Sequence, residues 1–192
     1  MTLGEPLTRN PNPRQETWAL LEQIEEASPT PAPAAMLFEA LTKASPFQRL
    51  VLLVITQSSS DLKALQVWQS LQPMISSPGS VVVMQMDGLQ DAIQPSGNAL
   101  LKARIIKEAA ASLKTSYSDN RLPTDLPSVT ALAMGIGPKT ALAWLNMEAC
   151  EGVDPAGVAV DTHVQRISKA LGWVPADTSS PQSCRQALEG WL

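Results

Sequence analysis

A chain of 192 residues, of which 44% are hydrophobic and 17% are charged, is long enough to bury a core and too hydrophobic to be disordered. Its net charge of −4 and its pI of about 5.0 do not by themselves indicate nucleic-acid binding, although residues 100–170 carry a slight excess of basic side chains. We find no run of about 18 apolar residues that predicts a membrane span, and the first residues lack an apolar signal core. We therefore expect a cytoplasmic protein, associated with the nucleoid if it is bacterial.

Cysteine and histidine are scarce in this sequence. The two cysteines, Cys150 and Cys184, are too few for a disulfide framework or for a site with four thiolate ligands. The single histidine, His163, argues against a histidine-rich metal centre. The sequence therefore predicts no protein metal site.

The first third of the chain predicts short helices joined by proline-containing connectors. Residues 1–15 are polar and form a loose tail, whereas residues 16–27 carry apolar side chains at helical spacing and are followed by the connector 28–35. Further helices are predicted over residues 36–43, 47–56 and 62–71. Ser45 and Pro46 are typical of the N-cap and first position of a helix, and the apolar segment after them predicts a buried central helix.

A polar cluster separates the second and third of these helices. Gln57 begins it, and Asp61 is placed to cap the helix that follows. Gln57 is interpreted in two ways, either as an ordinary polar residue at the end of a helix or as a side chain presented at the mouth of a groove.

The middle of the chain predicts loops, a short helix and one long amphipathic helix. Residues 73–80 read as a loop, and the valines 81–83 resemble a strand locally but lead into a short helix over 88–93. A turn then precedes a helix over 99–113, with Lys102, Arg104 and Lys107 near its polar side, which is either a solvated face or a basic surface. Residues 114–128 form a loop. Because no long segment has a strand period, the chain is predicted to be all-α.

Residues 131–145 read as a helix, a tight glycine hairpin and a second helix. Gly135, Ile136 and Gly137 permit the sharp turn, and Pro138 stands at the first position of the second helix. Backbone N–H groups at the start of a helix attract anions such as phosphate, and Lys139 stands beside the same opening. The motif alone is weak, because an ordinary helix–turn–helix corner has the same pattern.

The last part of the chain predicts two more helices after a loop over 151–157. Asp161 is placed to cap a helix over 162–171, which Gly172 stops, and a final helix begins at residue 181.

Four segments in this order resemble the endonuclease III group of helix-hairpin-helix (HhH-GPD) DNA glycosylases. They are SPFQRLVLLVITQSSSD (45–61), Gly97 followed by Lys102-Ala103, GIGPKTA (135–141) and VDTHVQRISKALG (160–172). The resemblance runs from about residue 15 to residue 192. It implies a two-lobed helical fold, with a six-helix barrel over 36–150 that carries the hairpin, and a second lobe built from 16–35 and 151–192.

The resemblance also implies a function and a set of site residues. It implies base excision repair on duplex DNA that holds a damaged base or an abasic site, with the damaged nucleotide flipped out of the stack. Lys139 matches the family's nucleophile, which forms a Schiff base and makes the enzyme a glycosylase with lyase activity, and Asp161 matches its catalytic aspartate. Oxidised pyrimidines are the expected lesions.

The remaining site residues follow from the same resemblance. Gln57 matches the glutamine that fills the space left by the flipped base. Gly135, Ile136, Gly137 and Thr140 are expected to hold a backbone phosphate, with a monovalent cation as a possible companion, and Lys102 to contact DNA.

Three features depart from the family pattern. Ala133-Met134 stand where Leu-Pro usually precedes the hairpin, and Lys139 and Asp161 are 22 positions apart (139 to 161), slightly more than is usual. The sequence also ends at Trp191-Leu192 without the four cysteines that hold an iron–sulfur cluster in many relatives, so we expect no cofactor and a truncated second lobe. Apolar surface near Trp191 is then expected to attract a protein partner or a second copy of the chain.

An alternative function from a different class is a non-catalytic DNA-binding or protein-interaction module that has kept the fold. The acidic total charge favours this alternative, whereas Lys139 and Asp161 argue against it, because a binding module needs neither residue.

Overall fold

The computed structural model describes residues 33–116, 122–149 and 156–190. The predicted tail over 1–15, the predicted helix over 16–27, Cys150 and Trp191 lie outside these ranges. Contacts divide the chain into residues 1–32 and a compact unit that begins at Pro33, and only the second unit is described below.

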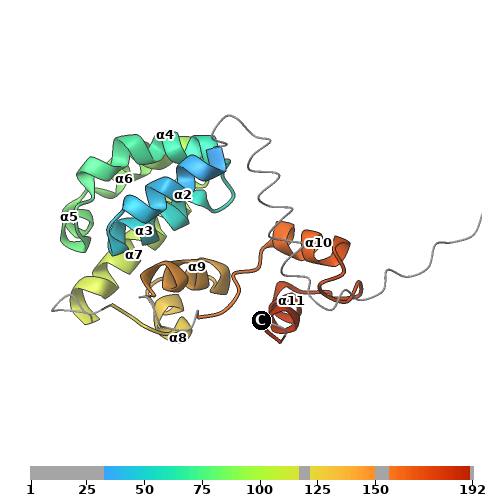
Figure 1. Ribbon diagram of the computed structural model, residues 1–192. Helices are drawn as coiled ribbons and strands as arrows, with labels where there is room; N and C mark the ends of the chain where they lie inside the picture. Colours follow the sequence, from blue (N-terminus) through green and yellow to red (C-terminus); the bar gives the residue numbers. More distant parts are fainter. Residues whose placement is uncertain (1–32, 117–121, 150–155, 191–192) are drawn as a thin grey trace, which may run out of the picture. The chain divides into compact units, whose positions relative to one another are not determined.

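The described ranges contain helices and no strands, which confirms the all-α prediction (Figure 1). The α-helices are α2 (Pro33–Lys43), α3 (Pro46–Thr56), α4 (Asp61–Leu71), α5 (Pro78–Val83), α6 (Met86–Ile93), α7 (Ala99–Ser116), α8 (Leu126–Thr130), α9 (Pro138–Glu148), α10 (Thr162–Ala170) and α11 (Pro181–Glu189). Two short 3-10 turns, η1 (Gln72–Met74) and η2 (Gln94–Ser96), extend α4 and α6. Within these ranges no helix combines the length and apolarity that crossing a bilayer requires.

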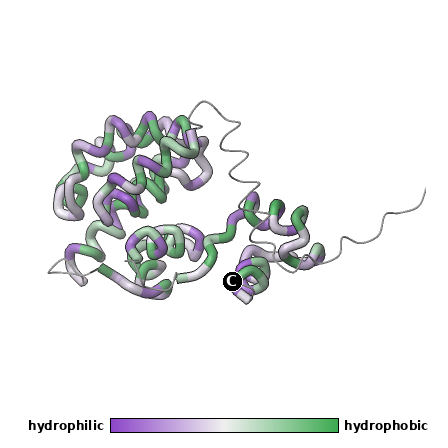
Figure 2. The backbone as a smooth tube through the Cα atoms, in the orientation of Figure 1, coloured by the Kyte–Doolittle hydropathy of each residue, from purple (hydrophilic) through white to green (hydrophobic). Residues whose placement is uncertain are grey.

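Helix α3 is the central helix of the larger core, as its apolar sequence predicts. Ser45 caps it in a capping box with Gln48, and Pro46 occupies its first position. Its apolar side chains join a buried cluster that draws on every α-helix from α2 to α9. In Figure 2 hydrophilic and hydrophobic residues succeed each other along these helices, as amphipathic helices require.

A second, smaller buried cluster belongs to α10, α11 and the segments beside them. It consists of Val160, Val174, Cys184 and Leu188. The last two helices therefore have an apolar core of their own.

Helix α5 corrects the prediction of a loop over 73–80 followed by a strand-like segment. Ser77 accepts a hydrogen bond from the Ser80 amide in a second capping box, and Pro78 occupies the first position of the helix. Lys107 of α7 donates its ammonium group to the carbonyls of Val81, Val82 and Met84 at the other end. A distant lysine thus caps the last carbonyls of the short helix, which overrides the strand preference of the valines.

Arg49 of α3 fixes the position of α9 against the central helix. Its guanidinium donates to the carbonyls of Leu41, Ala44 and Met147 and pairs with the carboxylate of Glu148. Burial raises the pKa of Glu148, and the charge and hydrogen bond of Arg49 offset part of that increase. These contacts hold the end of α9 that lies opposite the hairpin.

Candidate functional site

The glycine hairpin connects α8 to α9, so its first helix lies earlier than the sequence predicted. Asp125 caps α8 by accepting a hydrogen bond from the Ser128 amide. Residues 131–137 form the turn, in which Gly135 has a φ of +113°. A Cβ on Gly135 would lie 2.5 Å from Ile105 Cδ1. Glycine is therefore required here both for the backbone angle and for the space.

The N-terminus of α9 presents free backbone donors at an open position. Gly137 is the N-cap in an extended conformation, with no side-chain cap and no atom within 4 Å of a Cβ built on it. Within the described residues, the amides of Gly137, Lys139 and Thr140 have no recorded acceptor. Free amides at the positive end of a helix form an anion site.

Ile136 and Thr140 face the protein interior, unlike the other residues that were predicted to hold a phosphate. The side chain of Ile136 is buried and its amide donates to the Ala133 carbonyl at 3.2 Å, so Ile136 holds the turn together. Thr140 is also buried, and its hydroxyl accepts a hydrogen bond from Gln57 Nε2 at 3.1 Å. The groups that remain available to bind the predicted phosphate are therefore the backbone amides of Gly137, Lys139 and Thr140.

The structure turns Gln57 toward the hairpin. Its Nε2 donates to the Gly135 carbonyl at 3.2 Å as well as to the Thr140 hydroxyl. Gln57 is half-buried at the end of α3, so it links this helix to both sides of the turn.

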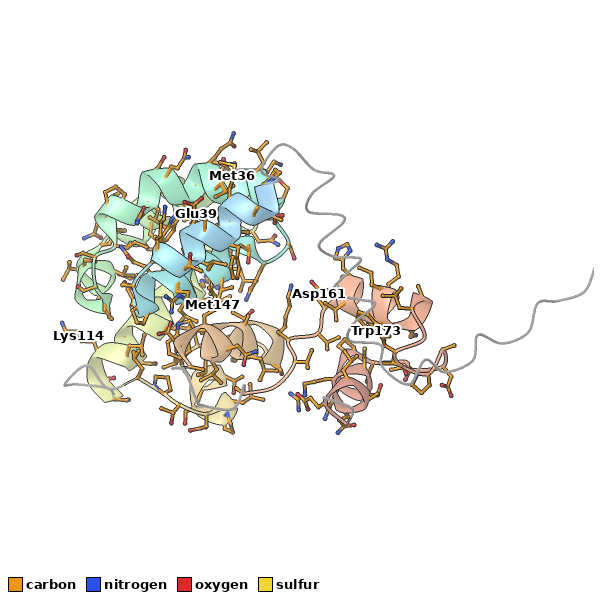
Figure 3. All side chains as sticks on the ribbon, in the orientation of Figure 1. Met36, Glu39, Lys114, Met147, Asp161 and Trp173 are labelled. Carbon is orange, nitrogen blue, oxygen red and sulfur yellow. The ribbon has the colours of Figure 1, made fainter. Side chains whose placement is uncertain are left out.

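Lys139 and Asp161, the two residues predicted to be catalytic, lie next to each other. The distance from Lys139 Nζ to Asp161 Oδ2 is 3.0 Å, and their side chains are 58% and 27% exposed. Lys139 follows Pro138 at the start of α9, and Asp161 lies immediately before α10 (Figure 3). Both side chains of the pair are therefore in contact with solvent.

Asp161 uses its two carboxylate oxygens for different contacts. Oδ1 accepts hydrogen bonds from the amides of His163 and Val164 at 2.9 and 2.8 Å, which confirms the predicted N-cap, and Oδ2 faces Lys139. Partial burial raises the pKa of Asp161. The hydrogen bonds from Val164, Lys139 and His163 lower it by more than burial raises it, so the pKa of Asp161 lies below its ordinary value. The carboxylate is thus held in its ionised form and in a fixed orientation.

The structure contradicts the prediction that Lys102 contacts DNA from the surface of α7. Its side chain is buried, with 2% exposure, and Nζ donates to the Ile55 carbonyl at 2.8 Å, the Ser96 carbonyl at 2.8 Å and the Ser96 hydroxyl at 3.3 Å. These contacts use the three donors of an ammonium group. Burial lowers the pKa of Lys102. Lys102 connects the end of α3 to η2 and offers no donor to a phosphate.

Glu108 is a residue of the site that the sequence analysis missed. Its carboxylate on α7 accepts a hydrogen bond from the Met134 amide at 3.3 Å, next to the hairpin glycine. No local pattern relates an acidic residue on the polar face of a helix to a turn 26 positions later.

The residues that the structure describes contain no group of three potential metal ligands. The sequence has two cysteines, whereas an iron–sulfur cluster of the endonuclease III type needs four thiolates. The residues present therefore do not fit such a cluster.

Comparison with known proteins gives matches over most of the chain. The family profile described as HhH-GPD superfamily base excision DNA repair protein matches residues 51–192. The chain is 33% identical to Endonuclease III-like protein 1 of Bos taurus over 153 residues, which cover 80% of this chain and 48% of that protein. It is also 33% identical to Endonuclease III of Thermotoga maritima over 147 residues, 77% of this chain and 65% of the relative.

Solved structures match the helical fold as well. An endonuclease III in a non-covalent DNA complex superposes with a TM-score of 0.72 and 26% identity, over 93% of this chain and 77% of that one. A thermostable thymine-DNA glycosylase superposes with a TM-score of 0.60 over 79% of this chain and 76% of that one, and at 12% identity this match shows the fold alone. The chain spans about half the length of the vertebrate relatives that it matches.

Proposed function

Because the chain belongs to the HhH-GPD superfamily of base excision DNA repair proteins, in its endonuclease III-like glycosylase family, we propose that it is a DNA glycosylase with abasic-site lyase activity on duplex DNA. One observation carries the proposal. Lys139 Nζ lies 3.0 Å from Asp161 Oδ2 at the N-terminus of α9, where free amides can hold a phosphate. A pure binding module does not need an exposed lysine and an ionised aspartate at this position.

In the proposed reaction Lys139 is the nucleophile. Its ammonium group, paired with Asp161 in the structure, first gives up a proton to solvent. The neutral amine then attacks C1′ of the damaged nucleotide, the new N–C1′ bond forms, and the bond between C1′ and the base breaks, with the electron pair leaving on the base. The base takes up a proton from solvent. The nitrogen on C1′ loses a proton and O4′ gains one as the C1′–O4′ bond breaks, so that the opened sugar is joined to Lys139 by an imine. Loss of a proton from C2′ then expels the 3′ phosphate by β-elimination and nicks the strand.

Asp161 is proposed to stabilise positive charge at the sugar. A carboxylate near C1′ lowers the energy of a transition state that resembles an oxocarbenium ion. The amides of His163 and Val164 fix Oδ1, so that Oδ2 remains on the side of Lys139. A carboxyl group whose pKa lies below its ordinary value remains ionised at neutral pH, which suits this electrostatic role.

Duplex DNA that carries an oxidised pyrimidine or an abasic site is the proposed substrate. The solved relatives include an endonuclease III complex with DNA and a trapped covalent endonuclease III–DNA intermediate. The amides at the start of α9 are proposed to hold the phosphate backbone beside the flipped nucleotide.

Incision assays test the proposal directly. Three labelled duplexes are compared, one with thymine glycol, one with an abasic site and one undamaged, with wild-type protein and with Lys139→Gln. We expect wild-type protein to cut both damaged duplexes and Lys139→Gln to cut neither. If folded wild-type protein binds the duplexes and cuts none of them, the proposal is wrong and a non-catalytic DNA-binding module is the better assignment.

A further inference from the structure

A side chain of α9 holds the described segment that leads into α10. Asn146 Nδ2 donates to the Gly157 carbonyl at 2.8 Å, and Asn146 Oδ1 accepts from the Ala156 amide at 2.9 Å. We refer to these two hydrogen bonds as the Asn146 link. An asparagine amide supplies a donor and an acceptor together, which neither aspartate nor leucine can do.

A second contact holds the same segment from α11. The Val158 amide donates to Glu189 Oε1 at 2.9 Å. Gly157 has a φ of +132°, and a Cβ there would lie 2.4 Å from Glu189 Oε1 and 3.4 Å from Leu142 Cδ2. Glycine therefore lets the backbone pass close to both α9 and α11.

The spacing of these residues relates the Asn146 link to the candidate catalytic pair. Lys139 and Asn146 are seven positions apart on α9, which is two helical turns and about 10 Å along one side of the helix. Asp161 follows Gly157 by four positions, and four extended residues span about 13 Å. The segment from Gly157 to Asp161 is therefore long enough to run back along α9 from Asn146 to Lys139.

We propose that Asn146 is the positioning residue that places Asp161 Oδ2 beside Lys139 Nζ, because it attaches the returning chain to the helix that carries Lys139. The importance of this pair for catalysis rests on the proposed function. The Asn146 link is not needed to bury the core of α10 and α11, because Val160, Val174, Cys184 and Leu188 pack together separately. Its effect is instead to set the distance between two residues on different helices.

The pKa of Asp161 reports whether its carboxylate lies beside Lys139, and it can be measured without an activity assay. The carboxyl-carbon NMR signal of Asp161, identified by its loss in Asp161→Asn, is followed against pH in four proteins. These are wild type, Lys139→Gln, Asn146→Ala and the control Gln165→Ala. Gln165 matches Asn146 chemically, since its amide donates to the Thr178 carbonyl at 3.2 Å, but it makes no contact with α9 that the structure records.

We expect the pKa of Asp161 to rise in Asn146→Ala by as much as it rises in Lys139→Gln, because both changes remove the hydrogen bond from Lys139. Gln165→Ala should titrate like wild type. Asn146→Asp, which keeps the acceptor for Ala156 and loses the donor to Gly157, should fall in between and replaces Asn146→Ala if that variant does not fold. A wild-type titration in Asn146→Ala, or in Asn146→Asp where it replaces that variant, overturns the proposal.

A kinetic measurement then separates this inference from the proposed function. In single-turnover borohydride trapping on abasic DNA, Asn146→Ala should react at least about tenfold more slowly than wild type, because small misplacements of reacting groups are costly. Its Kd for the same duplex should stay within about twofold of wild type, since the phosphate site is unchanged. Absence of trapping by wild-type protein refutes the lyase proposal, while the titration still decides the role of Asn146. Equal trapping rates in wild type and Asn146→Ala refute the positioning role alone.

Discussion

Gly135 and Gly137 lie two positions apart in the hairpin, yet the fold requires glycine at only one of them. Gly135 has a φ of +113° and contacts Ile105 so closely that a Cβ would lie 2.5 Å from Cδ1 and 2.8 Å from Cγ1. Gly137 has a φ of −81° and open space around its Cα. The two alanine substitutions therefore test different properties of the same turn.

The expected cost of Gly135→Ala has two parts. A non-glycine residue in a rare backbone conformation costs about 1–3 kcal/mol, and displacing the buried Ile105 side chain costs about 1–3 kcal/mol more. For a chain of this length, a loss of about 2 kcal/mol or more lowers the melting temperature by at least about 4 °C. Gly137→Ala should cost about 1 kcal/mol or less, because alanine is only a poorer N-cap than glycine.

DNA binding should show the opposite order of effects. A methyl group on Gly137 stands where the free amides of α9 are proposed to meet a phosphate, so we expect the Kd for duplex DNA to rise about tenfold, or about 1.4 kcal/mol. Thermal melting and fluorescence anisotropy on both variants give the comparison. If Gly135→Ala melts at the same temperature as wild type, the steric explanation of the hairpin is wrong. If Gly137→Ala binds duplex DNA with the same Kd as wild type, the proposed phosphate site is wrong.

Three further predictions follow from contacts in the same region. Lys102→Met should lower the free energy of unfolding by about 2–4 kcal/mol, because the carbonyls of Ile55 and Ser96 lose their buried partner, and it should leave the slope of log Kd against log salt unchanged. A reduced salt slope in that variant contradicts the buried placement of this lysine. Asp161→Ala should cost about 1 kcal/mol at pH 7 through loss of the N-cap. Because the pKa of Asp161 lies below its ordinary value of 3.8, this contribution is present above that pH and disappears as the pH falls through the folded-state pKa, so urea unfolding curves of the two proteins should converge in acid. Gln57→Ala should cost about 1 kcal/mol in urea unfolding, because its hydrogen bonds to Gly135 and Thr140 are lost, and an unchanged midpoint would show that they do not stabilise the hairpin.

Local signals in the sequence predicted the helix boundaries best. Ser45-Pro46 and Asp161 mark helix starts because a capping side chain acts on amides two or three residues away. Gly172 marks the end of α10, where its φ of +69° favours glycine. Such signals depend on neighbours in the chain, so they can be recognised without the fold. Asp61 shows their limit, since Ser60 is the N-cap of α4 and Asp61 is its first residue.

The remaining features depend on partners far away in the sequence. Lys102 has the spacing of a surface residue, but it is buried because the carbonyl of Ile55, 47 positions away, needs a donor. Lys107 stabilises α5 in the same way across more than twenty positions. The turn of Gln57 toward the hairpin and the Asn146 link also join residues from different helices. No spacing rule identifies such pairs before the helices are packed.

The Schiff base proposed between Lys139 and DNA is tested by identifying the residue that is trapped. Wild-type protein is mixed with a duplex that holds one abasic site, reduced with borohydride and digested, and the peptide that carries the deoxyribose remnant is sequenced by mass spectrometry. We expect an adduct on Lys139, no adduct in Lys139→Gln, and a slower reaction in Asp161→Asn. An adduct on another amine, or the absence of one in folded, DNA-bound protein, would contradict this proposal.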